Sequence, residues 1–152
     1  MIRVASWWLI KLLIRLQFLE IQQLLTADLA TWLADTDNQP LLLDARTLEE
    51  YQVSHLHNAK LVTDDLKDSI ESVDQEMPIV VYCSVGYRSS AIARSLESKG
   101  YKNVFNLSGS IFQWVNENRP VYRQEKVVTE VHPYNKFWQY LLDNKYRIEE
   151  KG

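Results

Sequence analysis

The stretch IVVYCSVGYRSSAIARSLESKG, residues 79–100, contains the single cysteine of the chain and decides the fold prediction. Residues 79–82 are a β-branched and aromatic run that follows a proline, which predicts a buried strand. From Ser89 onward, apolar residues at helical spacing before a glycine predict a helix, with Ser89 or Ser90 as its N-cap. Cys83 therefore begins a tight loop between a strand and a helix.

A loop of this kind favours the thiolate form of Cys83. Successive backbone N–H groups form an anion-binding nest there, and the helix adds about half a positive charge at its N-terminus. Arg88, at the far end of the loop, adds a full cation. A buried, inert side chain is the commoner role of a lone cysteine, but that role does not need a glycine-containing loop closed by an arginine. Cys83 is therefore the candidate nucleophile.

Length and composition indicate a soluble globular protein. The 152 residues, 46% of them hydrophobic, suffice for one domain with a real core and extensions. A net charge of −3 argues against a general nucleic-acid binder, because phosphate contacts need clustered lysine and arginine. One cysteine excludes an internal disulfide, and without a clear secretory signal we expect a cytoplasmic protein. His55, His57 and His132 lack the spacing of metal ligands, and we expect no metal and no organic cofactor.

Residues 1–20 form a cationic, apolar segment in which Arg3, Lys11 and Arg15 precede the first acidic residue, Glu20. The segment is typical of a helix that is apolar over most of its circumference. It is too short and too charged for a transmembrane helix, and no small-residue cleavage site follows it. Three roles stay open: the helix folds back on the domain, it lies in a membrane interface and makes the protein membrane-peripheral, or it binds a protein partner.

Short apolar strands alternate with helices through the middle of the chain. Thr26 is a candidate N-cap, and Thr47 with Glu50 matches a capping box. The alternation predicts an α/β fold with a parallel sheet covered on both faces. Ligands of such sheets bind beyond the carboxyl ends of the strands, where both Asp44 and Cys83 fall. The expected strands are 41–43, 61–62, 79–82 and 103–107, and the expected helices are 24–33, 47–51, 64–73, 89–99 and 111–115.

Two segments, LLLDARTLEEYQVSHLHNAKLV (41–62) and IVVYCSVGYRSSAIARSLESKGYKNVFNLSGSIFQWVNENRPVY (79–122), resemble the two halves of a rhodanese homology domain. The marks are Asp44-Ala45-Arg46, the pair Tyr51 and His55, the Cys83 loop closed by Arg88, and the Ser108-Gly109 turn. This chain has His57-Asn58-Ala59 where the family usually shows Pro-Gly-Ala. Asparagine tolerates a positive φ, so we expect the turn to survive. The resemblance implies a three-layer sandwich with a mainly parallel central sheet and helices on both faces, over residues 21–122.

The resemblance also implies transfer of a sulfur atom. The family cysteine takes a sulfane sulfur from a donor, holds it as a persulfide, and passes it to a thiophilic acceptor. Carried over to this chain, Cys83 is the nucleophile, and the backbone of the loop holds the charged terminal sulfur. Asp44 and Arg46 resemble a supporting polar pair, although an ordinary strand-end ion pair is the alternative. The donor is thiosulfate or a small-molecule or protein persulfide, and the acceptor is an external thiol. The substrate-binding loop residues are Ser84, Val85, Gly86, Tyr87 and Arg88.

Two other classes of function remain as alternatives. Cysteine-dependent phosphatases and arsenate reductases related to rhodaneses have a loop that is one residue longer, whereas four residues separate Cys83 from Arg88 here. The shorter loop favours sulfur over a tetrahedral oxyanion. A non-catalytic rhodanese module that binds a protein partner usually lacks the loop cysteine, which this chain keeps.

The last part of the chain, residues 123–152, is predicted to be an aromatic helical extension. Aromatic and leucine residues from Tyr134 to Leu142 recur there at helical intervals. Packing onto the domain or against the N-terminal tryptophans is favoured over a dedicated recognition helix. Residues 149–152 are expected to fray.

Overall fold

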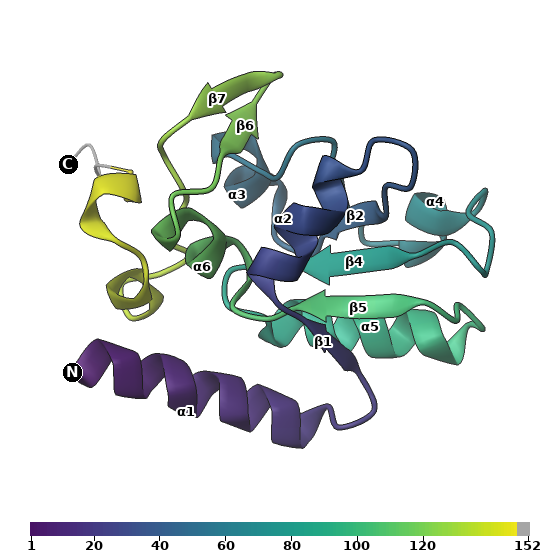
Figure 1. Cartoon of the computed structure of the whole chain (residues 1–152), viewed down its shortest axis with the longest axis horizontal. Coiled ribbons are helices and arrows are strands. Elements are labelled where there is room, and N and C mark those ends of the chain that lie inside the picture. The colour runs from purple at the N-terminus through teal and green to yellow at the C-terminus, as the bar shows by residue number, and fades with distance from the viewer. Residues whose placement is uncertain (149–152) are drawn as a thin grey trace.

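The computed structural model describes residues 1–148 and places a five-stranded sheet at the centre of the molecule (Figure 1). A separate two-stranded hairpin follows the last helix of the domain. In chain order the elements are α1 (Ile2–Gln17), β1 (Gln22–Leu24), α2 (Thr26–Ala34), β2 (Leu41–Asp44), α3 (Leu48–Val53), β3 (Lys60–Leu61), α4 (Leu66–Ile70), β4 (Ile79–Tyr82), α5 (Tyr87–Ser98), β5 (Val104–Leu107), α6 (Ser110–Asn116), β6 (Val121–Arg123), β7 (Lys126–Val128), and the 3₁₀ helices η1 (Trp138–Leu141) and η2 (Asn144–Tyr146).

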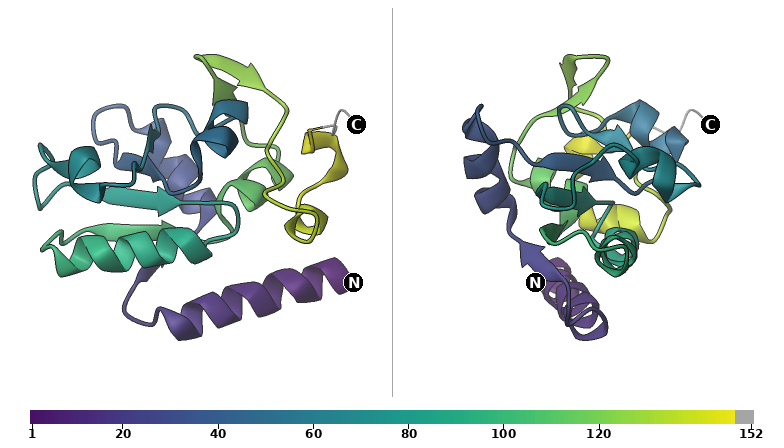
Figure 2. Two further views of the ribbon diagram at one scale, coloured as in Figure 1. Left: turned by 180° about the vertical axis from the view of Figure 1, so that it is seen from behind. Right: turned by 90° about the vertical axis from the view of Figure 1, so that its right-hand side faces the viewer.

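The central sheet is parallel, in the order β1-β5-β4-β2-β3. Its middle strand β4 is β-branched and aromatic, and all four of its residues are buried because both faces are covered. Val80 packs on one face with Phe112 of α6 and with α2. Val81 packs on the other face with Leu96 of α5. Figures 1 and 2 show these layers. The predicted three-layer α/β fold is confirmed.

Local sequence signals set several turns and helix starts. The capping box of Thr47 and Glu50 is present at the start of α3, as predicted. Asn58 has a φ of 60°, so the turn that usually contains glycine survives with asparagine. The prediction for Thr26 is wrong: it lies inside α2 and its hydroxyl donates to Glu117 at 2.5 Å.

Helix α5 begins earlier than predicted. Gly86, with a φ of 117°, occupies the N-cap position, and the helix starts at Tyr87. Left-handed backbone is accessible to glycine, so the chain turns into the helix inside the loop itself. Ser89 and Ser90 therefore do not cap the helix. The Ser90 hydroxyl donates to the carbonyl of Gly86 at 2.6 Å, and the Ser89 hydroxyl faces Cys83.

Helix α1 folds back on the domain, which was one of the three alternatives. Ile14 and Phe18 are buried in the same cluster as α5. At the other end of α1, Arg3 forms an ion pair with Asp143 and donates to the carbonyl of Leu141 at 3.2 Å. The N-terminus therefore lies beside the C-terminal segment, as Figure 1 shows.

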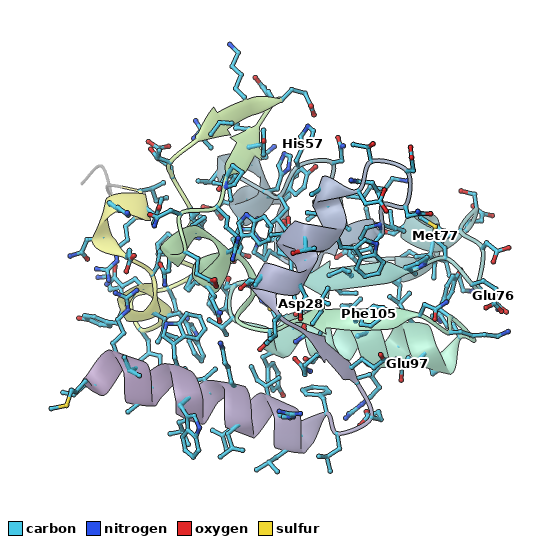
Figure 3. The ribbon with its side chains drawn as sticks, viewed as in Figure 1. Asp28, His57, Glu76, Met77, Glu97 and Phe105 are labelled. Atoms are coloured by element: carbon cyan, nitrogen blue, oxygen red, sulfur yellow. The ribbon has the colours of Figure 1, made fainter. Side chains whose placement is uncertain are left out.

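The opposite side of α1 is exposed and apolar, and its side chains project away from the rest of the molecule (Figure 3). Val4, Trp8 and Leu9 are each at least half exposed. Because the domain covers one side only, a membrane surface or a protein partner stays a prediction for the other side. No helix within residues 1–148 combines the length and apolar character needed to cross a membrane.

The C-terminal segment packs onto the domain, but not as one α-helix. Its helical turns are the two short 3₁₀ helices η1 and η2, and β7 precedes them. Leu142 leaves the helical region with φ −97° and ψ 133°, which ends η1 and lets Leu141 and Leu142 both enter the core. The predicted helical extension is therefore present only as two short 3₁₀ helices, because core packing overrides the helical spacing. Residues 149–152, expected to fray, lie outside the described residues.

Candidate active site

Cys83 follows β4 directly, at the carboxyl edge of the sheet, and is 1% exposed. Its Sγ accepts the N–H of Gly86 at 3.2 Å and lies 3.3 Å from the hydroxyl of Ser89. The same hydroxyl lies 2.5 Å from Oδ1 of Asn106. A serine hydroxyl has one proton, so it can donate to the sulfur when Cys83 is a thiolate and to Asn106 when it is a thiol.

The loop offers a group of backbone donors beside the sulfur. Helix α5 has 12 residues, and its first N–H groups have no intrahelical acceptor. Within residues 1–148, five N–H groups of the loop and the first turn donate to no other protein group. Together with the dipole of α5 they favour a bound negative charge. They belong to Ser84, Val85, Tyr87, Arg88 and Ser89.

Arg88 closes the loop, but its charge is already paired. Nη1 and Nη2 of Arg88 each donate to a carboxylate oxygen of Glu50 at 2.8 Å. Nη2 also donates to the hydroxyl of Ser84 at 2.9 Å. The guanidinium lies 4.3 Å from the ring centre of Tyr134, a cation–π distance. The arginine therefore enters the site as half of an ion pair rather than as a free cation.

Glu50 joins α3 to this loop. Its side chain accepts the backbone N–H of Thr47 at 2.9 Å in addition to the donors of Arg88 and Ser84. Burial alone would raise the pKa of Glu50, but the hydrogen bonds from Arg88 and Thr47 and the charges of Arg88 and Arg46 outweigh it and lower the pKa to about 2. Glu50 is therefore a carboxylate at neutral pH.

Asp44 and Arg46 form a buried ion pair, and both side chains are fully inaccessible. Nε and Nη2 of Arg46 donate to the two carboxylate oxygens of Asp44 at 2.9 and 2.7 Å. The hydroxyl of Tyr82 donates to Asp44 at 2.8 Å. Burial, and to a smaller extent the negative charge of Asp44, raise the pKa of Tyr82 well above its ordinary value. Neither Asp44 nor Arg46 lines the pocket at Cys83. Their position favours the alternative of a structural pair, one that holds the end of β2.

A pocket of about 600 Å³ opens onto Cys83. The loop lines it with Ser84, Val85, Tyr87 and Arg88 as well as Cys83. The rest of the lining comes from the two ends of the chain. Helix α1 supplies Ile10, Leu13, Ile14, Leu16 and Gln17, and the C-terminal segment supplies Tyr134 and Trp138.

Of the five loop residues predicted to bind substrate, only Gly86 does not line the pocket. The surroundings of Gly86 explain why this position requires glycine. A side chain there would approach Nδ2 of Asn106 to 3.2 Å and Cδ1 of Ile14 to 3.7 Å, at a backbone φ unsuited to other residues. Gly86 therefore lets α1 and β5 approach the loop closely.

Several residues that lie near Cys83 could not be assigned to the site from the sequence. The sequence predicts Glu50 only as a helix-capping residue and Ser89 only as an N-cap. Asn106 lies in a strand and donates to Gln23 at 2.7 Å. The walls from α1 and Tyr134 come from segments that are distant in the sequence, so only the tertiary structure brings them to Cys83.

None of the three histidines is among the residues that line the pocket at Cys83. The ring of His55 stacks on that of Tyr51, with ring centroids 4.1 Å apart. His57, which is labelled in Figure 3, contacts Tyr122 and Glu125 in the β6–β7 hairpin. In the described part of the chain, no group of three or more His, Cys, Asp or Glu side chains is placed to hold a metal ion.

Comparison with known proteins shows which family this chain resembles in sequence. The family model of the rhodanese-like domain matches residues 26–117, more than half of the chain. The thiosulfate sulfurtransferase GlpE of Coxiella burnetii is 33% identical over 75 residues, which cover 49% of this chain and 70% of that protein.

Solved structures share the fold. A rhodanese-like domain protein from Staphylococcus aureus is 23% identical, with a TM-score of 0.58 over 71% of this chain and 97% of that one. A thiosulfate sulfurtransferase from Pseudomonas aeruginosa is 20% identical, with a TM-score of 0.64 over 77% of this chain and 23% of that one. At these identities the likeness concerns the fold alone.

Proposed function

This chain belongs to the rhodanese-like domain family, and from that premise we propose that it is a sulfurtransferase with Cys83 as its persulfide-forming nucleophile. The donor is thiosulfate or a persulfide, and the acceptor is an external thiol. A sequence relative named as a thiosulfate sulfurtransferase supports the reaction class.

One observation carries the proposal. The sulfur of Cys83 lies at the start of α5, with donors from Gly86 and Ser89 at 3.2 and 3.3 Å and with further unpaired N–H groups in the same loop. These donors stabilise a thiolate before the reaction. They also stabilise the negative terminal sulfur of a persulfide after it. A cysteine that served only for packing would not need this arrangement.

The reaction consists of two displacements. The thiolate of Cys83 attacks the sulfane sulfur of the donor, a sulfur–sulfur bond forms, and the donor's own bond to that sulfur breaks. The electron pair leaves with the remainder of the donor, as sulfite when the donor is thiosulfate. An incoming thiolate then attacks the terminal sulfur and regenerates the Cys83 thiolate. Because Cys83 is the only cysteine, the acceptor comes from another molecule, and a reducing compartment such as the cytoplasm suits a lone reactive thiol.

Intact-mass spectrometry tests the proposal. Incubation with thiosulfate or a small-molecule persulfide should add the mass of one sulfur atom, and cyanide or a reducing thiol should remove it. The variant Cys83→Ala, which has no thiol, should gain no mass. A protein that gains no sulfur but hydrolyses para-nitrophenyl phosphate through Cys83 would be a phosphatase. A protein inactive in both assays would support the non-catalytic binding module.

A further inference from the structure

The two extensions of the chain build most of the pocket at Cys83. Of its twelve lining residues, seven lie outside residues 26–117, five on α1 and two in the C-terminal segment. Most of the entrance to the sulfur is therefore built by residues that lie outside the part of the chain that matches the family. Its chemistry indicates what the entrance can accept.

The pocket is apolar, and its few hydrophilic side chains are already paired. They are Gln17, Ser84 and Arg88, beside isoleucine, leucine, valine and aromatic side chains. Gln17 donates to the hydroxyl of Tyr87 at 3.1 Å. Arg88 is bound to both oxygens of Glu50 and to Ser84. A small dianion would find no free cation here, whereas a carbon chain would displace water from apolar walls.

The backbone near Tyr134 holds one wall in place. Tyr134 has a φ of 67°, a left-handed backbone conformation that is unfavourable for an aromatic residue. Its N–H donates to Nδ1 of His132 at 2.9 Å, and its ring covers the guanidinium of Arg88. The strained turn thus places an aromatic face over the charged end of the loop, which reduces its access to solvent.

We propose that this pocket selects a sulfur donor in which the sulfane sulfur is joined to an apolar organic group, an alkyl or aryl persulfide or thiosulfonate. This inference rests on the proposed sulfurtransferase function. With a thiosulfonate, the Cys83 thiolate attacks the terminal sulfur, the bond between that sulfur and the sulfonyl sulfur breaks, and the electron pair leaves on a sulfinate. The apolar group lies against α1 while the transferred sulfur stays at the loop donors.

A homologous series of donors tests this inference, because the reacting atoms stay the same while the chain length changes. We would measure the second-order rate constant of Cys83 persulfide formation with methane-, butane- and hexanethiosulfonate. The rate constant should rise roughly two- to fourfold per methylene that the pocket buries, and by at least about tenfold across the series. Thiosulfate serves as the donor without a carbon group.

Two variants of α1 form a matched pair. Leu13 lines the pocket and Leu9, one turn away, does not, while both are about half exposed, at 56% and 50%. Leu13→Gln should flatten the dependence on chain length, and Leu9→Gln should keep it. A wild-type rate independent of chain length, with the persulfide still formed, would overturn this inference and leave the sulfurtransferase function intact. Equal slopes in the two variants would also overturn it. A protein that forms no persulfide with any donor would overturn both.

Discussion

At the scale of single residues, Glu50 links the helix cap to the cysteine loop. The carboxylate caps α3 through Thr47 and binds Arg88 and Ser84 at the same time. Because it is almost completely buried, its charge depends on these partners. The position of the Arg88 side chain at the start of α5 is therefore set from α3 as well as from its own helix.

The variant Glu50→Gln tests this role through pH. The pKa of Glu50 is about 2 in the folded protein, below its ordinary value of 4.5, so folding favours the ionised form. That contribution is complete above about pH 4.5 and is lost as the pH falls toward 2. We expect the variant to lower the free energy of unfolding by about 1–3 kcal/mol at pH 7 and by clearly less near pH 3.

Urea denaturation at several pH values measures this difference. Glu49→Gln is the control, because Glu49 lies on the same helix and its side chain is 83% exposed. This substitution should change the free energy of unfolding by less than about 0.5 kcal/mol. A loss of stability in Glu50→Gln that is the same at pH 7 and pH 3 would contradict the assigned role of the carboxylate.

At the scale of secondary structure elements, α1 has two apolar sides with different surroundings. One side packs on the domain and lines the pocket. The other side is exposed and carries Trp8 and Leu9, with Arg15 as its one charge, and residues 1–19 contain no acidic side chain. Such a helix face is typical of one that lies in the interface of an anionic membrane.

We therefore expect the protein to sediment with anionic phosphatidylserine-containing vesicles, and the double variant Trp8→Glu/Leu9→Glu to weaken this binding by about tenfold or more. Val127→Glu is the control, because Val127 is a similarly exposed apolar residue on β7. Equal sedimentation of all three proteins would exclude the helix as the contact. If sedimentation velocity shows a dimer for the wild type and for Val127→Glu but a monomer for the double variant, the exposed face of α1 binds a second copy of the chain instead.

At the scale of the whole molecule, helix α1 contacts the C-terminal segment, and both line the pocket at Cys83. Arg3 of α1 binds Asp143 and the carbonyl of Leu141, and Leu142 is fully buried in the main core cluster. Both extensions are thus packed parts of one structure. We expect them to unfold together with the central sheet rather than separately.

The variant Leu142→Ala tests this cooperativity. Removing a fully buried leucine side chain should lower the free energy of unfolding by about 2–5 kcal/mol, although the residue lies beyond the family match. Far-UV circular dichroism and tryptophan fluorescence should report a single coincident transition. Tyr140→Ala, at a position that is 67% exposed, should change stability by less than about 0.5 kcal/mol. Two separate transitions in the wild type would show that the C-terminal segment folds independently.

Much of the central fold follows from local patterns. Strand β4 coincides with the predicted run 79–82, because a β-branched segment bounded by a proline has few alternatives. The Thr47–Glu50 capping box is present because its two hydrogen bonds join residues only three apart. The start of α5 was not predicted correctly, since Gly86 turns the chain before either serine can cap it.

By itself, the sequence determined the α/β class, the parallel sheet and the place of Cys83 between β4 and α5, because these depend on local periodicity and on a motif of neighbouring residues. Only the tertiary structure decided what surrounds that cysteine. The pairing of Arg88 with Glu50 and the pocket walls from α1 and Tyr134 depend on contacts between distant segments. Local patterns carry no information on such contacts, because apolar residues satisfy a helix equally well whether they face a core, a membrane or a substrate.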